Sequence, residues 1–252
     1  MTAQTRAYQS VADIRAPEWQ VLASKRILFG HQSVGSNIIS GVEEIMSVHK
    51  QVKMNISRVE GAATILKPGF YHFGVGRNAD PRSKIDDFVH RLRAGLGSDV
   101  DMAFFKFCYV DFDAATDAGA LFRDYQRAMT DLKKEFPKIV FAHVTVPLVT
   151  VQSGPKAWVK KILGKTVYGT EDNYRRNEFN TLLLATYTGI EPVFDLAKME
   201  STYPDGARSK TVSNNREIFV LAPEYTSDGG HLNQAGRVRL AAEFLRFLAS
   251  TR

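Results

Sequence analysis

Three residues of the sequence have the types and spacing of a serine nucleophile with its general base. Ser33 lies in the polar, glycine-flanked stretch GHQSVGSN at 30–37, directly after the short apolar run RILF. Asp228 and His231 lie three positions apart in the stretch TSDGGHLNQAG at 226–236. This spacing lets the Asp228 carboxylate reach one ring nitrogen of His231, which leaves the other nitrogen free to take a proton. A pair of this kind beside a serine hydroxyl is suited to nucleophilic catalysis.

Each half of this set also has a purely structural interpretation. A serine is common where a helix begins, because its hydroxyl satisfies one of the first backbone amides. Asp228 and Asn233 are suited to accept backbone N–H groups in a turn that leads into a helix, with His231 packed on that helix. Taken alone, the residues leave both interpretations open for each segment.

Short β-branched or aromatic runs alternate with amphipathic stretches, which predicts an α/β fold with helices on both faces of a sheet. We expect strands at 25–29, 53–59, 101–110, 138–148 and 191–196. We expect helices at 34–50, 81–95, 118–136, 173–187 and 234–249. The strand at 101–110 is almost wholly apolar and should be central, buried on both faces.

The other segments are expected to connect these elements. Residues 60–81 are predicted to be a turn-rich connection, and the irregular region near 150–171 an excursion over one edge of the sheet. The polar stretch 200–216 is expected to be a surface loop. No repeat or linker divides the chain, so residues 1–252 are expected to form a single domain.

The serine turn after the first predicted strand and the D-x-x-H block before the last helix resemble the SGNH/GDSL hydrolase superfamily. Residues 228–233 read DGGHLN and, with Gly236, match the final block of that family. The layout agrees over nearly the whole chain, whereas the motifs that carry the resemblance are two short blocks. The resemblance implies a three-layer α/β/α architecture with a flavodoxin-like, five-stranded parallel sheet. It also implies that Ser33 is the nucleophile, His231 the general base and Asp228 the orienting carboxylate.

The nucleophile block departs from the family pattern. The usual Gly-Asp-Ser is replaced by GHQS at 30–33, which looks closer to carbohydrate esterases with a Gly-Gln-Ser block. Because His31 and Gln32 are next to the serine, we expect them to line the pocket and bind substrate.

A second departure concerns the oxyanion. The family has Gly-x-Asn-Asp after its third strand, whereas residues 108–111 here read CYVD, so the asparagine that donates to the oxyanion is missing. A serine hydrolase still needs hydrogen-bond donors at that point, each of which lowers the barrier by about 3–4 kcal/mol. We expect one donor to be the backbone N–H of Ser33. The others are expected from the stretch GVGRNADP, as the N–H of Gly76 and the side-chain amide of Asn78.

These features predict a serine esterase that hydrolyses a small acyl ester, most simply an acetyl group on a carbohydrate, without a cofactor. Two alternatives stay open. The same triad supports a polysaccharide O-acetyltransferase. A non-catalytic, flavodoxin-like binding module is the other alternative; the missing Gly-x-Asn-Asp favours it, and the Asp228–His231 pair argues against it.

Composition argues against several other classes. The net charge of +6, from 33 Lys and Arg against 27 Asp and Glu, is mild and spread along the chain, so a nucleic-acid partner is not expected. The densest basic stretches, KAWVKKILGK and NYRRNEF, alternate with apolar residues as solvated helix faces do. The histidines show no metal-ligand spacing and Cys108 is the one cysteine, so neither a metal site nor an internal disulfide is expected.

No membrane partner is expected either. No stretch approaches the roughly 18 apolar residues that cross a bilayer, and the first residues lack the apolar core of a secretory signal. The chain as given is therefore expected in the cytoplasm, and a periplasmic or secreted location stays open if an export signal has been removed.

Overall fold

Parallel strands form the centre of the molecule. The computed structural model describes residues 11–50, 52–60, 65, 67–152, 154–155, 163 and 167–251. Five strands form one sheet in the order β2-β3-β1-β4-β5, and each neighbouring pair is parallel. Their bounds are β1 Arg26–His31, β2 Ile56–Arg58, β3 Gly69–Gly74, β4 Met102–Phe105 and β5 Val140–Phe141. The predicted α/β class with a five-stranded parallel sheet is confirmed.

Two further parallel strands continue this arrangement. β6 (His143–Val144) follows β5 after one residue and pairs with β7 (Val193–Phe194). β2 lies at the edge, outside β3, and β5 and β6 together occupy one strand position. Without β2, the order across the sheet is therefore β3, β1, β4, β5/β6 and β7. This is the flavodoxin-like order 2-1-3-4-5, in which the strand order reverses at β1. The crevice beyond the carboxyl end of β1 is therefore where such a sheet binds its ligand.

β3 is the strand that the sequence patterns missed. The turn-rich connection expected at 60–81 is wrong for Gly69–Gly74, which lies in the sheet between β2 and β1. Phe70 packs into the core on one face of the sheet and Phe73 into the core on the other. A strand buried on both faces lacks the apolar–polar alternation that marks a half-exposed strand, and here glycines stand at both ends.

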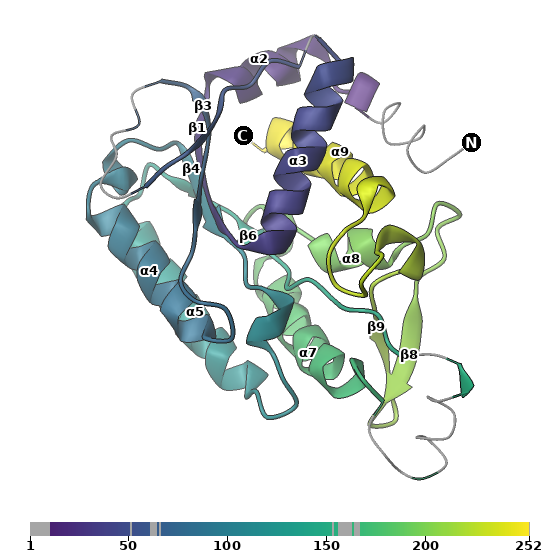
Figure 1. Ribbon diagram of the computed structural model, residues 1–252. Helices are drawn as coiled ribbons and strands as arrows, with labels where there is room; N and C mark the ends of the chain where they lie inside the picture. The colour runs from purple at the N-terminus through teal and green to yellow at the C-terminus, as the bar shows by residue number, and fades with distance from the viewer. Residues whose placement is uncertain are drawn as a thin grey trace.

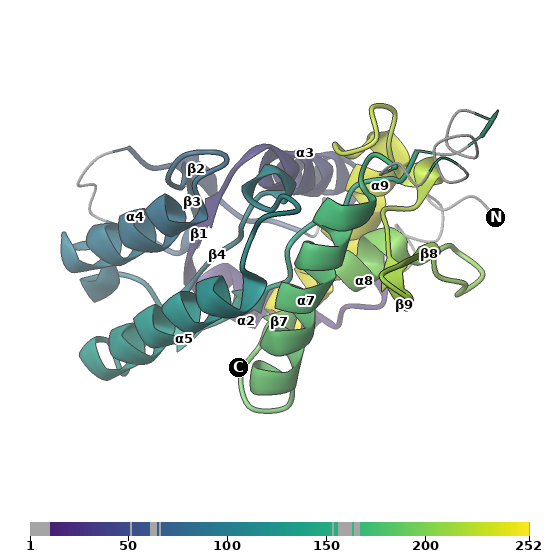
Figure 2. The ribbon, with the colours of Figure 1, turned by 90° about the horizontal axis from the view of Figure 1, so that it is seen from below.

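Helices cover both faces of this sheet (Figures 1 and 2). α2, α3, α8 and α9 pack on one face around a core that includes Phe29 and Phe244. α4, α5 and α7 pack on the other face around Phe105 and Tyr125. The bounds are α2 Ala16–Ser24, α3 Ser33–Val48, α4 Pro81–Arg93, α5 Ala118–Glu135, α7 Thr170–Tyr187, α8 Leu196–Ser201 and α9 Gln234–Ser250.

The two expected irregular regions are partly regular. An antiparallel hairpin of β8 (Lys210–Ser213) and β9 (Arg216–Phe219) includes the end of the loop expected at 200–216. α7 already begins at Thr170, inside the excursion expected near 150–171. Within that excursion, residues 153, 156–162 and 164–166 lie outside the described residues.

α7 buries polar side chains, so the expectation that NYRRNEF is a solvated face is wrong. The buried polar residues are Asn173 and Arg176 of this stretch and Asn180, which directly follows it. The Asn180 side chain bonds to both the N–H and the C=O of Val146, and Asn173 does the same at Val149. These amides satisfy backbone groups of residues beyond the end of β6.

Glu200 at the end of α8 is a buried carboxyl group. One of its oxygens accepts a hydrogen bond from the N–H of Leu148, and the other has no hydrogen-bond partner among the described residues. Burial raises the pKa of Glu200 to about 8, from an ordinary value of 4.5. Between these two values the unfolded chain releases the proton while the folded protein keeps it.

We therefore predict that Glu200→Gln changes how stability depends on pH. The wild-type free energy of unfolding should fall as the pH rises from 4.5 to about 8, by up to about 1.4 kcal/mol per pH unit, because only the unfolded state gains by ionising this group. The variant should lack this contribution. Urea unfolding at several pH values in that range measures it, with Glu43→Gln, an exposed position on α3, as control. Parallel pH profiles for wild type and Glu200→Gln would contradict the prediction.

Candidate active site

Ser33 lies at the carboxyl edge of the sheet, where β1 passes into α3. β1 ends at His31, and Ser33 is the first residue of α3. β3 and β4 flank β1 on either side. The first amides of a helix have no intrahelical acceptor and carry the positive end of its dipole. The N–H of Ser33 is one of these amides, so it is suited to stabilise negative charge that develops beside it.

The Ser33 hydroxyl does not cap the helix. The cap position is Gln32, in an extended backbone conformation, and its side chain makes no capping bond. Ser33 is partly exposed, and its hydroxyl has no hydrogen bond to a described residue. The capping interpretation of this serine is therefore not what the structure shows, and its hydroxyl is available for chemistry.

Asp228 and His231 form a hydrogen-bonded pair. Asp228 Oδ2 lies 2.7 Å from His231 Nδ1, and Oδ1 accepts the N–H groups of Gly230 at 2.9 Å and of His231 at 2.8 Å. These contacts, the backbone N–H of Gly230 first, hold the pKa of Asp228 well below its usual range. An ionised carboxylate only accepts, so Nδ1 carries the proton and Nε2 keeps its lone pair. The helix-entry role falls to Asn233, whose side chain accepts the N–H of Gly236.

Contacts from two other segments hold this turn in place. Gly229 has φ +90°, which favours glycine, and its carbonyl accepts the N–H of Thr150 at 2.8 Å. The N–H of Leu232 donates to Asn37 Oδ1 at 3.0 Å. Asn37 lies one turn after Ser33 on the same side of α3. This bond therefore brings the residue after His231 against the first turns of the helix that begins at Ser33.

Tyr109 is a further polar residue at this site. Its hydroxyl lies 3.3 Å from His231 Nε2, and the two rings meet edge to face at 5.6 Å between centroids. Burial raises the pKa of Tyr109 to about 12, so the hydroxyl is a donor near neutral pH. The sequence analysis missed this residue. The available signal is its place in CYVD at 108–111, next to Val110, which stands where the family has asparagine.

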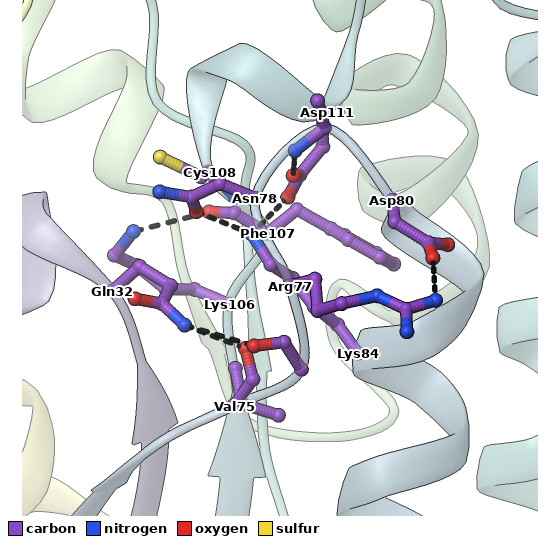
Figure 3. A network of polar contacts seen from close by, with 12 residues as sticks. Gln32, Val75, Arg77, Asn78, Asp80, Lys84, Lys106, Phe107, Cys108 and Asp111 are labelled. Carbon is purple, nitrogen blue, oxygen red and sulfur yellow. Dashed lines mark hydrogen bonds and ion pairs between the residues drawn. The ribbon is translucent and has the colours of Figure 1, made fainter.

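Gln32 and His31 differ in what they contact. Gln32 Nε2 donates to the carbonyls of Val75 at 2.9 Å and Gly76 at 3.2 Å, so this side chain ties the nucleophile turn to the segment after β3 (Figure 3). His31 is 4% exposed, and its Nε2 lies 3.0 Å from His72 Nδ1. Burial lowers the pKa of His31 to about 3. The buried ring argues against the expected substrate contact by His31, because it faces a strand neighbour and not the surface.

The two expected oxyanion donors, Gly76 and Asn78, also differ in what they contact. The N–H of Gly76 donates to Asp87 Oδ2 at 2.9 Å, which argues against a second role as an oxyanion donor. Asn78 is exposed, and its Oδ1 accepts a hydrogen bond from Lys84 Nζ at 3.2 Å. Its amide nitrogen has no acceptor among the described residues.

No protein-family model and no curated protein matches the sequence, but solved structures do. A proposed acylhydrolase from Bacteroides fragilis is 15% identical, with a TM-score of 0.52 over 97% of this chain and 94% of that chain. The fold is that of the SGNH/GDSL hydrolases. The resemblance predicted from the two sequence blocks is thus confirmed at the level of the fold.

Two other structures of lower TM-score cover most of the chain. A proposed lipolytic protein of the G-D-S-L family from Desulfitobacterium hafniense is 11% identical, with a TM-score of 0.46 over 88% of this chain and 98% of that chain. The periplasmic domain of a lipopolysaccharide acetyltransferase from Salmonella Paratyphi A is 13% identical, with a TM-score of 0.44 over 86% of this chain and 81% of that chain.

Among the described residues, no group of three or more His, Cys, Asp or Glu side chains is placed to hold a metal ion. In the same part of the chain, no helix is long and apolar enough to cross a membrane.

We predict that Asp228 determines the tautomer of His231 in this SGNH/GDSL fold. In Asp228→Asn the side-chain oxygen can still accept the two backbone N–H groups, so the new amide nitrogen faces His231 Nδ1 and donates to it. The imidazole proton should then move to Nε2. ¹⁵N NMR distinguishes the two tautomers of the neutral histidine ring, and Ser227→Ala is the neighbouring control. An Nδ1–H tautomer in both Asp228→Asn and wild type would rule out this role.

Proposed function

We propose that this protein is a serine ester hydrolase of the SGNH/GDSL type, in which Ser33 is the nucleophile, His231 the general base and Asp228 the carboxylate that orients it. One observation carries the proposal. The Asp228 carboxylate is held by two backbone N–H groups and places Nδ1–H of His231 against itself, which leaves Nε2 to accept a proton. The N–H of the next residue, Leu232, donates to Asn37 in the first turns of the helix that begins at Ser33. A turn that only leads into a helix has no need of this second carboxylate contact.

The proposed hydrolysis needs only these three side chains, the ester and one water molecule. Ser33 Oγ attacks the ester carbonyl carbon while its proton passes to His231 Nε2, and Asp228 stabilises the imidazolium. The tetrahedral intermediate then breaks its bond to the alcohol oxygen, which takes the proton from Nε2. Water attacks the resulting acyl-serine, giving one proton to His231, and the acid leaves as Ser33 recovers that proton.

Tyr109 must leave Nε2 before Ser33 can donate to it. The distance of 3.3 Å between the Tyr109 hydroxyl and Nε2 is long for a hydrogen bond from a hydroxyl group, so exchange for the serine hydroxyl costs little. The released hydroxyl is still protonated near neutral pH, because burial raises its pKa to about 12. It can then donate to the bound substrate.

Two donors are proposed for the oxyanion: the backbone N–H of Ser33 and the side-chain amide of Asn78. The first belongs to the free amides at the start of α3. The second stands on the segment that Gln32 ties to the nucleophile turn through Val75 and Gly76. Their convergence on one point would give the developing charge two hydrogen bonds.

For the substrate we propose a small acyl ester, acetyl in the simplest case, on a carbohydrate. This part rests on the resemblance of the GHQS block at 30–33 to Gly-Gln-Ser esterases. Gln32 is partly exposed beside Ser33, so it can reach the alcohol part of the ester. The loops around residues 150–171 and 200–216 would contribute to substrate selection, since loops above a rigid sheet commonly do so.

A fluorophosphonate probe tests the nucleophile directly. We expect mass spectrometry to locate the adduct on Ser33, and both Ser33→Ala and His231→Ala to abolish labelling. Ser36→Ala is the matched control, because Ser36 is an exposed serine in the first turn of the same helix and should leave labelling unchanged. An adduct on another residue, or none in the wild type together with no hydrolysis of p-nitrophenyl acetate, would refute the proposal.

Adding an acyl acceptor to the assay distinguishes hydrolysis from acyl transfer. With p-nitrophenyl acetate as donor, an esterase should release acetate at a rate that added oligosaccharide does not raise. If an oligosaccharide acceptor instead raises donor turnover and becomes acetylated, the protein is a transferase that uses the same residues.

A further inference from the structure

A buried ion pair lies beneath the segment that carries Asn78. Lys84 and Asp111 both have fully buried side chains, and Lys84 Nζ lies 2.5 Å from Asp111 Oδ2. Asp111 also accepts the N–H of Cys108 at 2.6 Å and that of Ala79 at 3.0 Å. The pair therefore joins the segment after β3 to the segment after β4 (Figure 3).

These two strands are the neighbours of β1 on its two sides. The ion pair thus connects the segments that follow the two strands on either side of β1, the strand that leads to Ser33. Close packing holds the same segment from below. Gly76 has φ +50°, and a Cβ there would lie 2.6 Å from the backbone nitrogen of Lys84, so the segment rests directly on the first turn of α4.

Lys84 also contacts the Asn78 side chain. Its ammonium group donates to Asn78 Oδ1 at 3.2 Å. An ammonium group has no acceptor, so it can bond only to the oxygen end of an amide and repels the N–H₂ end. The amide nitrogen of Asn78 must therefore point away from Lys84, as Figure 3 shows.

Stability alone does not explain a charged pair at this place. Removing two charges from water has a large desolvation cost, and well-packed apolar side chains often hold such a position equally well. Apolar side chains would not distinguish the oxygen of an amide from its nitrogen. The charged pair does so, on the segment to which Gln32, the neighbour of the proposed nucleophile, donates hydrogen bonds.

We propose that Lys84, held by Asp111, is a positioning residue that turns the Asn78 amide so that its N–H₂ group faces the oxyanion. This inference rests on the proposed function, because an oxyanion forms only if Ser33 attacks an acyl group. It assigns the oxyanion donor to the segment after β3. The resemblance to the family implies a donor after β4 instead, at the position of Val110.

Asn78→Asp is the decisive variant. A carboxylate at this position keeps an oxygen for Lys84 but has no N–H₂ group to donate. We expect kcat for p-nitrophenyl acetate to fall by roughly 10²–10³-fold, the usual loss on removing one oxyanion donor, with KM changed only a few-fold. The thermal midpoint should stay at or above the wild-type value. Arg82→Met is the control, at an exposed position of α4, the helix that carries Lys84, and should keep wild-type kcat and KM.

The role of the ion pair needs a variant that folds. Lys84→Met alone leaves a buried unpaired carboxylate and is expected to lower stability strongly. Lys84→Met combined with Asp111→Asn removes both charges at nearly constant volume, and the remaining amide oxygen still accepts one of the two N–H groups that Asp111 holds. This double variant should fold, lose at least ten-fold in kcat and leave KM nearly unchanged, because the Asn78 amide is no longer turned.

The outcomes separate the two proposals. If Ser33 reacts with the fluorophosphonate probe and Asn78→Asp keeps wild-type kcat, the Asn78 assignment is overturned and the esterase stands. If the folded double variant keeps wild-type kcat, the positioning role of Lys84 is overturned. If Ser33 does not react in the wild type, the proposed function fails and this inference fails with it.

Discussion

The buried ion pair between Lys84 and Asp111 joins segments that follow two strands which are not neighbours, β3 and β4. β1 lies between those strands and ends at the turn to Ser33. Removing either charge leaves the other buried without a partner, at a cost of about 3–5 kcal/mol. The two segments on either side of the candidate nucleophile are therefore held at a defined separation by a contact that solvent does not screen.

The Asp228–His231 pair is organised in a different way, because it is exposed. Its side chains are 56% and 42% exposed, and at such exposure the attraction between charges contributes little. The geometry comes instead from backbone groups: two N–H donors to Asp228, the contact of Gly229 with Thr150, and the bond from Leu232 to Asn37. A short turn with a defined hydrogen-bond pattern therefore holds the histidine without burying it.

The sequence was more informative about the candidate reactive residues than about the residues that position them. Ser33 and the Asp228–His231 block stand in polar, glycine-containing turns, where their types and spacing are informative without a structure. Lys84 lies in the helix PRSKIDDFVHRLR, where a lysine among charged residues is expected to be solvated, and only the packing of α4 under the segment after β3 buries it. Arg176 of α7 was likewise expected to be solvated and is buried by tertiary packing. β3 was missed because GFYHFG has neither alternation nor a run of branched residues, although the class of the sheet was predicted correctly.

The missing Gly-x-Asn-Asp has a different meaning in this arrangement. An oxyanion donor is defined by where its N–H group points and not by the strand that carries it. Val110 stands at the asparagine position and is exposed, but Asp111 beside it is buried and forms an ion pair with Lys84. Lys84 in turn bonds to the oxygen of Asn78 on the other side. A binding module that had lost its chemistry would need no charged pair here, since apolar packing holds a loop as stably. The arrangement therefore favours a donor that has moved to the neighbouring segment over a site that has lost one.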